Sequence, residues 1–249
     1  MTTRFSNRDK AIIIGLYLSK FDVNALREFG FDGFHHAFNV LGYSIGVKPA
    51  SIKNYRDEFD PYFPNERKGW HKRTLRQNCK KFLETFSELQ FHDFTEYIKS
   101  FILTNYDIEK SIAETIQEDI SESVAKRLVT GKAAEEYFMV NYLKTNEFSG
   151  YELIDTRMFA CGFDFKLLSQ SDFYFVEVKG MNLNIGNIAM TEKEHSVARN
   201  FRERYCLFVV KNFIDRPNHV LFFNPLESIL EFKRHEREIV QISYSALMK

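Results

Sequence analysis

A stretch of alternating side chains between residues 162 and 180 most constrains the fold of this chain. Its second half has the pattern of a β-strand, in which successive side chains point to opposite faces, so Glu177 and Lys179 share one face. Its first half predicts a partner strand, with a polar turn at residues 169–172 between the two. Pairing of the two strands brings Asp164 beside Glu177.

The pairing of Asp164 with Glu177 predicts a site for a divalent cation. Two neighbouring carboxylates repel each other unless a cation neutralises them, and Mg²⁺ prefers oxygen ligands. Mg²⁺ held by one or two carboxylates keeps several waters and can contact a substrate phosphate. Lys179 is placed to orient or deprotonate an attacking water and to stabilise the charge of the transition state. A hairpin whose polar face simply meets solvent would show the same pattern, so this alternative stays open.

The motifs on this hairpin resemble those of the PD-(D/E)xK, or restriction-endonuclease-like, nuclease superfamily. G-x-D precedes E-V-K-G, residues 131–143 resemble a first core helix, and residues 190–210 are similar to the nuclease-like domain of NO VEIN-type proteins. The resemblance covers about residues 125–215. It implies a Mg²⁺-dependent phosphodiesterase whose catalytic residues are Glu135, Asp164, Glu177 and Lys179, with Asp164, Glu177 and the carbonyl of Val178 as metal ligands.

Two glutamates on predicted helices need a separate interpretation. Helical spacing favours Glu135 over Glu136 as the inward residue, although Ala134 stands where the family usually has glycine. Glu194 also resembles a position of the family pattern. However, Thr191 and Glu194 form the T-x-x-E pattern of a capping box, so we expect capping rather than catalysis from Glu194.

A basic region near the N-terminus predicts DNA binding. Residues 1–85 contain 15 Lys and Arg against 9 Asp and Glu, a net charge of +6, while the rest of the chain carries −6. Gly46 and Pro49 separate two apolar periodic stretches, which is typical of a helix, a turn and a helix. A plain helical hairpin or a solvated helix face would look alike. The residues expected to contact duplex DNA are Lys48, Ser51, Lys53, Asn54, Arg56, Arg67, Lys68, Lys72, Arg73 and Arg76.

The chain as a whole predicts an α+β protein in three parts. We expect a helical DNA-recognition domain at residues 1–85, which resembles regions attached to some restriction endonucleases, a helical connector at 86–129 and a nuclease domain at 130–249. The last part should hold a mixed β-sheet flanked by helices, with late strands after residue 216. The amphipathic segment 107–128 favours a bundle over a dimer contact. His35, His36 and His71 have no spaced partners, so they favour structural or phosphate-facing roles over metal binding.

Cysteine usage and hydropathy predict a cytoplasmic location. The three cysteines, at positions 79, 161 and 206, form no CxxC pair, and the chain has neither a signal-peptide pattern nor a membrane-length apolar run. The function expected is an endodeoxyribonuclease of restriction or defence type, acting as a homodimer because a duplex has two strands. The alternatives are a non-catalytic DNA-binding or regulatory protein on a nuclease-like scaffold, an interaction module that works beside a separate enzyme, and a repair or RNA-directed nuclease.

Overall fold

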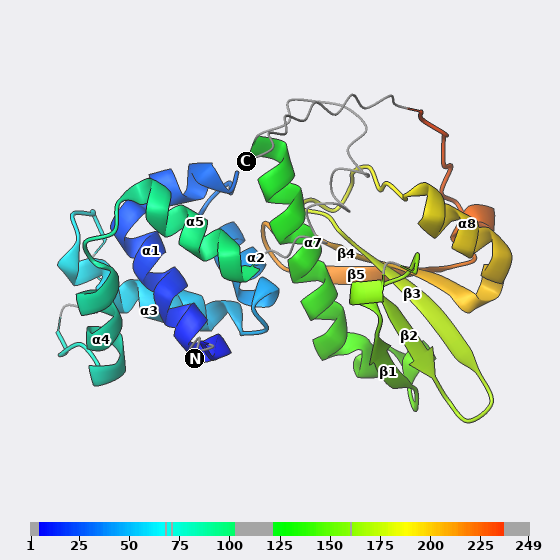
Figure 1. The fold of residues 1–249 in the computed structure, drawn as a ribbon, viewed down its shortest axis with the longest axis horizontal. Coiled ribbons are helices and arrows are strands. Elements are labelled where there is room, and N and C mark those ends of the chain that lie inside the picture. The colour runs from blue at the N-terminus through cyan, green and yellow to red at the C-terminus, as the bar shows by residue number, and fades with distance from the viewer. Residues whose placement is uncertain (1–4, 68, 71, 103–121, 160, 237–249) are drawn as a thin grey trace, which may run out of the picture.

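A helical N-terminal part lies beside a mixed β-sheet flanked by helices, as Figure 1 shows, which confirms the α+β prediction. The computed structural model describes residues 5–67, 69–70, 72–102, 122–159 and 161–236. The predicted residues Lys68 and His71, and most of the amphipathic segment 107–128, lie outside these ranges. Within the described residues, no helix combines the length and the apolar character that crossing a membrane requires.

The N-terminal part is built around α1, which runs from Asn7 to Glu28 and begins at a capping box between Ser6 and Asp9. Residues 11–19 of α1 are buried because neighbouring helices surround it. Gly15 permits the closest of these contacts, since a Cβ there would lie 2.5 Å from the Cβ of Tyr55 on α3. The other helices are α2 (Phe34–Ser44), α3 (Pro49–Phe59), α4 (Gln77–Phe86) and α5 (Phe91–Ile102).

The predicted helix, turn and helix are present as α2, residues 45–48 and α3. Gly46 adopts φ +69° in the turn, a conformation that glycine takes at little cost, and Pro49 occupies the first turn of α3. Residues 91–102, which were assigned to the connector, form α5 and pack against α1. This helix therefore belongs to the N-terminal bundle.

The C-terminal part contains a five-stranded sheet in the order β1-β2-β3-β4-β5. Among the strands of the described residues, only β3 and β4 pair in parallel, and such a pair needs a crossover connection, which α8 supplies. The predicted late strand is present as β5, whereas the apolar run at 238–246 lies outside the described residues. The elements are α7 (Glu122–Asn141), β1 (Glu152–Asp155), β2 (Phe165–Leu168), β3 (Phe173–Gly180), α8 (Glu192–Phe201), β4 (Tyr205–Lys211) and β5 (Asn218–Phe223), with 3₁₀ turns at Asp60–Tyr62, Tyr142–Lys144, Asn146–Phe148, Arg157–Phe159, Arg202–Arg204 and Pro225–Glu227.

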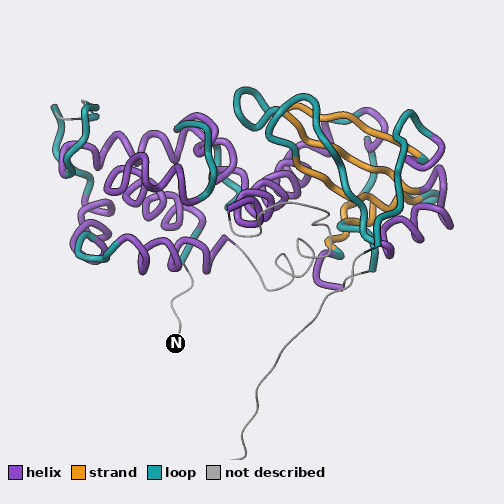
Figure 2. The backbone as a smooth tube through the Cα atoms, turned by 90° about the horizontal axis from the view of Figure 1, so that it is seen from above, coloured by secondary structure: helices purple, strands orange, loops and turns teal. Residues whose placement is uncertain are grey.

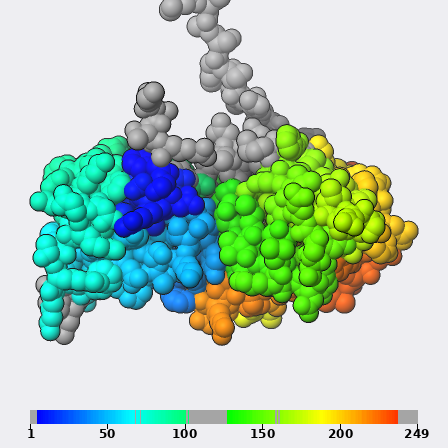
Figure 3. Space-filling view, turned by 90° about the horizontal axis from the view of Figure 1, so that it is seen from below, coloured from blue at the N-terminus to red at the C-terminus, as the bar shows by residue number. Residues whose placement is uncertain are grey.

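One hydrophobic core joins the two parts, because α2 packs against α7. The ring of Tyr43 on α2 lies 5.3 Å from that of Tyr137 on α7 and 6.1 Å from that of Phe213. In Figure 3 the light-blue surface of the N-terminal part borders the green surface of the C-terminal part. Polar contacts add to this interface: Asn39 donates to the carbonyl of Phe213 (2.8 Å), and His36 Nε2 lies 2.8 Å from Asn182 Oδ1.

Candidate active site and nucleic-acid surface

Glu177 and Lys179 lie on β3 in the middle of the sheet, opposite Leu207 and Val209 of β4. Alternation along the strand turns Gly180 toward α7, where a Cβ would lie 2.7 Å from the carbonyl oxygen of Thr130. The side chains of Glu177 and Lys179 therefore project from the opposite face, on which α8 begins. The shared face that the sequence predicts for these two residues is present.

Asp164 lies just before β2 and beside the same site. The pairing of Phe165 with Val176 places Asp164 opposite Glu177. The amide of Val178 donates to Asp164 Oδ2 at 2.9 Å. At the end of the hydrogen-bond ladder, this carboxylate oxygen therefore takes the role of a backbone carbonyl, which fixes the side chain. Asp164 and Glu177 are each only 1 % exposed. The structure thus brings together the two carboxylates that the hairpin pattern predicts.

Lys179 is held between two buried carboxylates. Its Nζ lies 2.9 Å from Glu177 Oε1 and 2.8 Å from Glu194 Oε2, and all three side chains are buried. In such surroundings charges attract more strongly than in water, but leaving one unpaired costs several kcal/mol. The ammonium group is therefore fixed in position beside Glu177.

Glu194 has two roles, of which the sequence predicts one. The amide of Thr191 donates to Glu194 Oε2 at 2.9 Å, and the amide of Glu194 donates to Thr191 Oγ1 at 3.2 Å, which confirms the capping box. The same oxygen, Oε2, also accepts from Lys179. The only sequence signal for this second contact is the order of strand, helix and strand, because this order places the start of α8 near the end of β3.

Glu135 is occupied by a different set of charges. Arg157 Nη1 lies 2.9 Å from a carboxylate oxygen of Glu135 and 2.9 Å from one of Glu136, and Lys132 Nζ lies 3.4 Å from Glu135. Glu135 is the more buried of the two glutamates, as helical spacing predicts. Burial opposes the charge of Arg157, but the hydrogen bonds that Arg157 donates to Asp155 and both glutamates outweigh it and raise the pKa of Arg157. Arg157 follows β1 within no motif, so sequence reasoning missed it.

The donor atoms fit Mg²⁺ through two carboxylates rather than three. Among the described residues, no three Asp, Glu, His or Cys side chains are grouped closely enough to hold a metal ion. Glu135 therefore does not join Asp164 and Glu177 as a third acidic ligand, because its carboxylate is bound to Arg157 and Lys132. Mg²⁺ commonly uses one or two carboxylates and completes its shell with water and phosphate oxygens.

Three of the arginines expected to contact DNA are bound to carboxylates of their own region. Arg56 is 8 % exposed, lies 2.5 Å from Asp57 Oδ1 and covers the rings of Phe34 and Phe38. It does not extend toward solvent, so the expectation that it reaches a base edge is not met. Arg56 shares the buried stripe of Ile52, Tyr55 and Phe59 at helical spacing, so it faces inward. The others are Arg67, held by Asp60 (2.9 Å) and Asp22 (2.7 Å), and Arg76, held by Glu58.

Other predicted DNA-contacting residues do face solvent. Lys48, Asn54, Lys72 and Arg73 are exposed, and Ser51 is half-buried. Lys53 is also exposed, although its Nζ lies 2.5 Å from Asp57. Their contact with DNA stays a prediction.

The Arg76–Glu58 contact gives the N-terminal part a defined response to acid. Burial opposes the charge of Glu58, but hydrogen bonds from the side chain and amide of Arg76 outweigh it, so the pKa of Glu58 lies below its ordinary 4.5. A lowered pKa means that the stabilisation is complete above pH 4.5 and is lost as pH falls through the folded-state value. We expect Glu58→Gln to lower the free energy of unfolding by about 1–3 kcal/mol at neutral pH.

Urea unfolding of the wild type and Glu58→Gln across the acid range measures this effect. The difference between the two proteins should shrink as pH falls below the ordinary pKa of glutamate. A difference that is the same at neutral and acidic pH would contradict the lowered pKa.

Comparison with known protein families gives a match in the C-terminal part. The family model described as "Protein NO VEIN, C-terminal" matches residues 134–223, from within α7 to the end of β5. No curated protein and no solved structure matches the chain. The matched range contains Asp164, Glu177, Lys179 and Glu194, so the similarity to a NO VEIN-type C-terminal domain is confirmed for the part that carries the site.

Proposed function

We propose that the protein is a Mg²⁺-dependent endodeoxyribonuclease of restriction or defence type that hydrolyses phosphodiester bonds in duplex DNA. The observation that carries this proposal is the buried group of Asp164, Glu177 and Lys179 at the middle of the sheet. Burying three charged side chains costs free energy that apolar residues would not cost, which is typical of a site kept for chemistry. The match to the NO VEIN C-terminal family covers these residues and supports the proposal.

Each residue of the group has a separate task in this reaction. Asp164 and Glu177 would hold Mg²⁺ with the carbonyl of Val178, and the bound ion supplies Lewis acidity and a water of lowered pKa. Lys179 orients the attacking water and stabilises charge on the reacting phosphate. Glu194 is a positioning residue, because it holds the ammonium of Lys179 from the side opposite Glu177.

The helical part would bind DNA, and a second copy of the chain would cleave the second strand. Lys48, Lys53, Lys72 and Arg73 are exposed and would contact phosphates of the DNA backbone. One site cleaves one strand at a time, so we expect a homodimer, whose two sites would cut both strands. The free cysteines Cys79, Cys161 and Cys206 accord with a reducing compartment such as the cytoplasm.

A non-catalytic DNA-binding protein on the same scaffold is the second candidate. The observation in its favour is that internal partners already engage the site: Val178 donates to Asp164, and Lys179 is paired with Glu177 and Glu194. Such a network pairs the buried charges without any metal. The two candidates differ in one measurable property, which is hydrolysis that depends on a divalent cation.

The test is incubation of the purified full-length protein with plasmid and phage DNA, in modified and unmodified forms. We expect cleavage with Mg²⁺ or Mn²⁺, none in EDTA, and recovery when the metal is restored. Ca²⁺ should support binding without cleavage. Cleavage that is indifferent to chelation would refute the metal assignment, and DNA binding without any cleavage would favour the non-catalytic candidate.

A further inference from the structure

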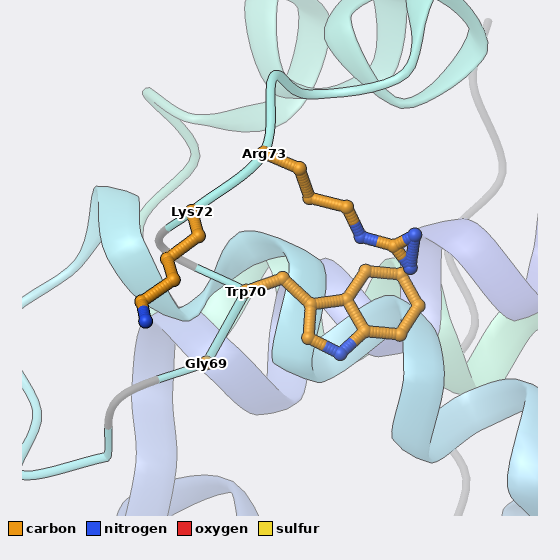
Figure 4. Close-up of a pocket in the computed structure, with 4 residues that line it drawn as sticks. All are labelled: Gly69, Trp70, Lys72 and Arg73. Carbon is orange, nitrogen blue, oxygen red and sulfur yellow. The ribbon is translucent and has the colours of Figure 1, made fainter.

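A basic hollow with one aromatic side chain lies in the loop between α3 and α4. Gly69, Trp70, Lys72 and Arg73 line it, as Figure 4 shows. Arg67 and Arg76 fix the loop at both ends through their ion pairs with Asp60 and Glu58. The hollow is therefore part of a tethered loop.

The backbone under the hollow is fixed to the end of α3. The amide of Trp70 donates to the carbonyl oxygen of Asp57 at 2.7 Å. Gly69 adopts φ +50°, and a Cβ there would lie 2.5 Å from the same carbonyl oxygen and 2.7 Å from the Cβ of Asp60. A larger residue at position 69 would push the loop off the helix. Close packing thus fixes the backbone from which the Trp70 side chain projects.

The side chains in the hollow combine an aromatic ring with uncompensated positive charge. The guanidinium carbon of Arg73 lies 3.7 Å from the ring centroid of Trp70, so the two are stacked. Lys72 and Arg73 are exposed, and within the described residues neither forms an ion pair with a carboxylate. In contrast, Arg56, Arg67 and Arg76 each form an ion pair with a carboxylate.

A planar ring and free cations side by side fit a nucleobase and its flanking phosphates. Each base stacked on an aromatic side chain contributes about 1–3 kcal/mol, and guanidinium groups add stacking and charge. In an intact duplex the faces of the bases are covered by their neighbours, so only an unpaired or extruded base can use such a site. We propose that Trp70 and Arg73 bind one unpaired nucleobase, while Lys72 contacts an adjacent phosphate.

This inference deepens the proposed function, on which it rests for the choice of nucleic acid as the partner. The hollow lies at the end of the helical part that points away from the sheet, as Figures 1 and 2 both show. Binding there is therefore separate from the chemistry at Lys179. It can be measured in EDTA, where the proposed cleavage does not occur.

Trp70 is the only tryptophan of the chain, so its emission reports on the hollow directly. We expect oligothymidylate of about ten nucleotides to quench this emission saturably in EDTA. An equal concentration of inorganic polyphosphate should not quench it, and a blunt duplex should quench it far less. An oligouridylate arm decides between DNA and RNA as the source of the base. Quenching by polyphosphate to the same extent would overturn the proposal, because charge alone would then explain binding.

Three variants separate stacking from charge. Arg73→Gln keeps Trp70 as the reporter and should weaken binding of the oligonucleotide about tenfold, which corresponds to about 1.4 kcal/mol. Lys81→Gln removes the same charge from the exposed surface of α4, outside the hollow, and should weaken binding by about twofold or less. Equal effects of Arg73→Gln and Lys81→Gln would overturn the proposal.

The third variant, Trp70→Phe, is followed by the anisotropy of a labelled oligonucleotide and should also bind about tenfold more weakly. Its circular dichroism must match that of the wild type; if it does not fold, Arg73→Gln alone decides. Wild-type affinity of a folded Trp70→Phe variant would overturn the inference. Saturable quenching by a protein that never cleaves DNA would instead refute the proposed reaction and leave the inference standing.

Discussion

The Asp164→Asn variant is expected to lose cleavage of duplex DNA by about 10³-fold or more while keeping its fold. The asparagine oxygen can still accept the hydrogen bond from the amide of Val178, so the end of the ladder is preserved. The variant nevertheless lacks a charge that Mg²⁺ needs. Removing one of two neighbouring carboxylates also relieves their repulsion, so the metal-free variant should be at least as stable as the wild type.

Two measurements and one control make this prediction specific. Thermal unfolding with and without Mg²⁺ should show that the metal stabilises the wild type, by about 2.7 kcal/mol at 100 times the dissociation constant, and not the variant. Glu152→Gln, an exposed carboxylate on β1, should behave as the wild type in both assays. Full activity of Asp164→Asn would remove this residue from the mechanism.

The Lys179→Met variant is expected to lose both activity and stability. Without the ammonium, Glu177 and Glu194 remain buried and lose the positive charge that lies between them, which should lower the free energy of unfolding by about 3–5 kcal/mol. Cleavage should vanish, because no group is left to orient the water. Lys166→Met is the matched control, since Lys166 lies on β2 against the rings of Phe173 and Phe175 and forms no ion pair among the described residues. It should change stability by less than about 1 kcal/mol.

A double variant separates the structural and chemical roles of Lys179. Glu194→Gln keeps the capping box, because glutamine also serves at that position, but removes one of the two buried negative charges. Lys179→Met with Glu194→Gln should therefore regain about 1–2 kcal/mol of stability over Lys179→Met alone, and yet remain inactive. Denaturant unfolding and plasmid cleavage of the four proteins of the cycle measure both quantities. Activity that returned together with stability would show that Lys179 acts only through the fold.

Local patterns predict the hairpin and the helix, turn and helix because their causes are local. Alternation sets the faces of Glu177 and Lys179, and a turn sets the pairing that brings Asp164 opposite Glu177. In the same way, Gly46 and Pro49 define the turn between α2 and α3 at the sequence level. These predictions needed no knowledge of distant contacts.

The contacts that the sequence could not predict join residues far apart or depend on a neighbour of opposite charge. Glu194 reaches Lys179 only because α8 crosses over between two parallel strands. Arg157 lies in the 3₁₀ turn after β1, which belongs to no motif, and meets Glu135 on α7. Arg56 lies on the buried stripe of α3, and no periodicity indicates that a carboxylate of the same helix is close enough to hold its guanidinium.

The joint between the helical part and the sheet has a consequence for where DNA would be cut. Asn182, two residues after Gly180, receives a hydrogen bond from Thr130 on α7 and lies 2.8 Å from His36 on α2. Through these contacts, α2 and α7 both meet the segment that directly follows the strand carrying Lys179. If a strand of DNA binds at Trp70 and is cut at Lys179, the distance between the binding site and the cleavage site is fixed. The cut should then fall at a constant number of nucleotides from the gripped base, whatever sequence lies between them.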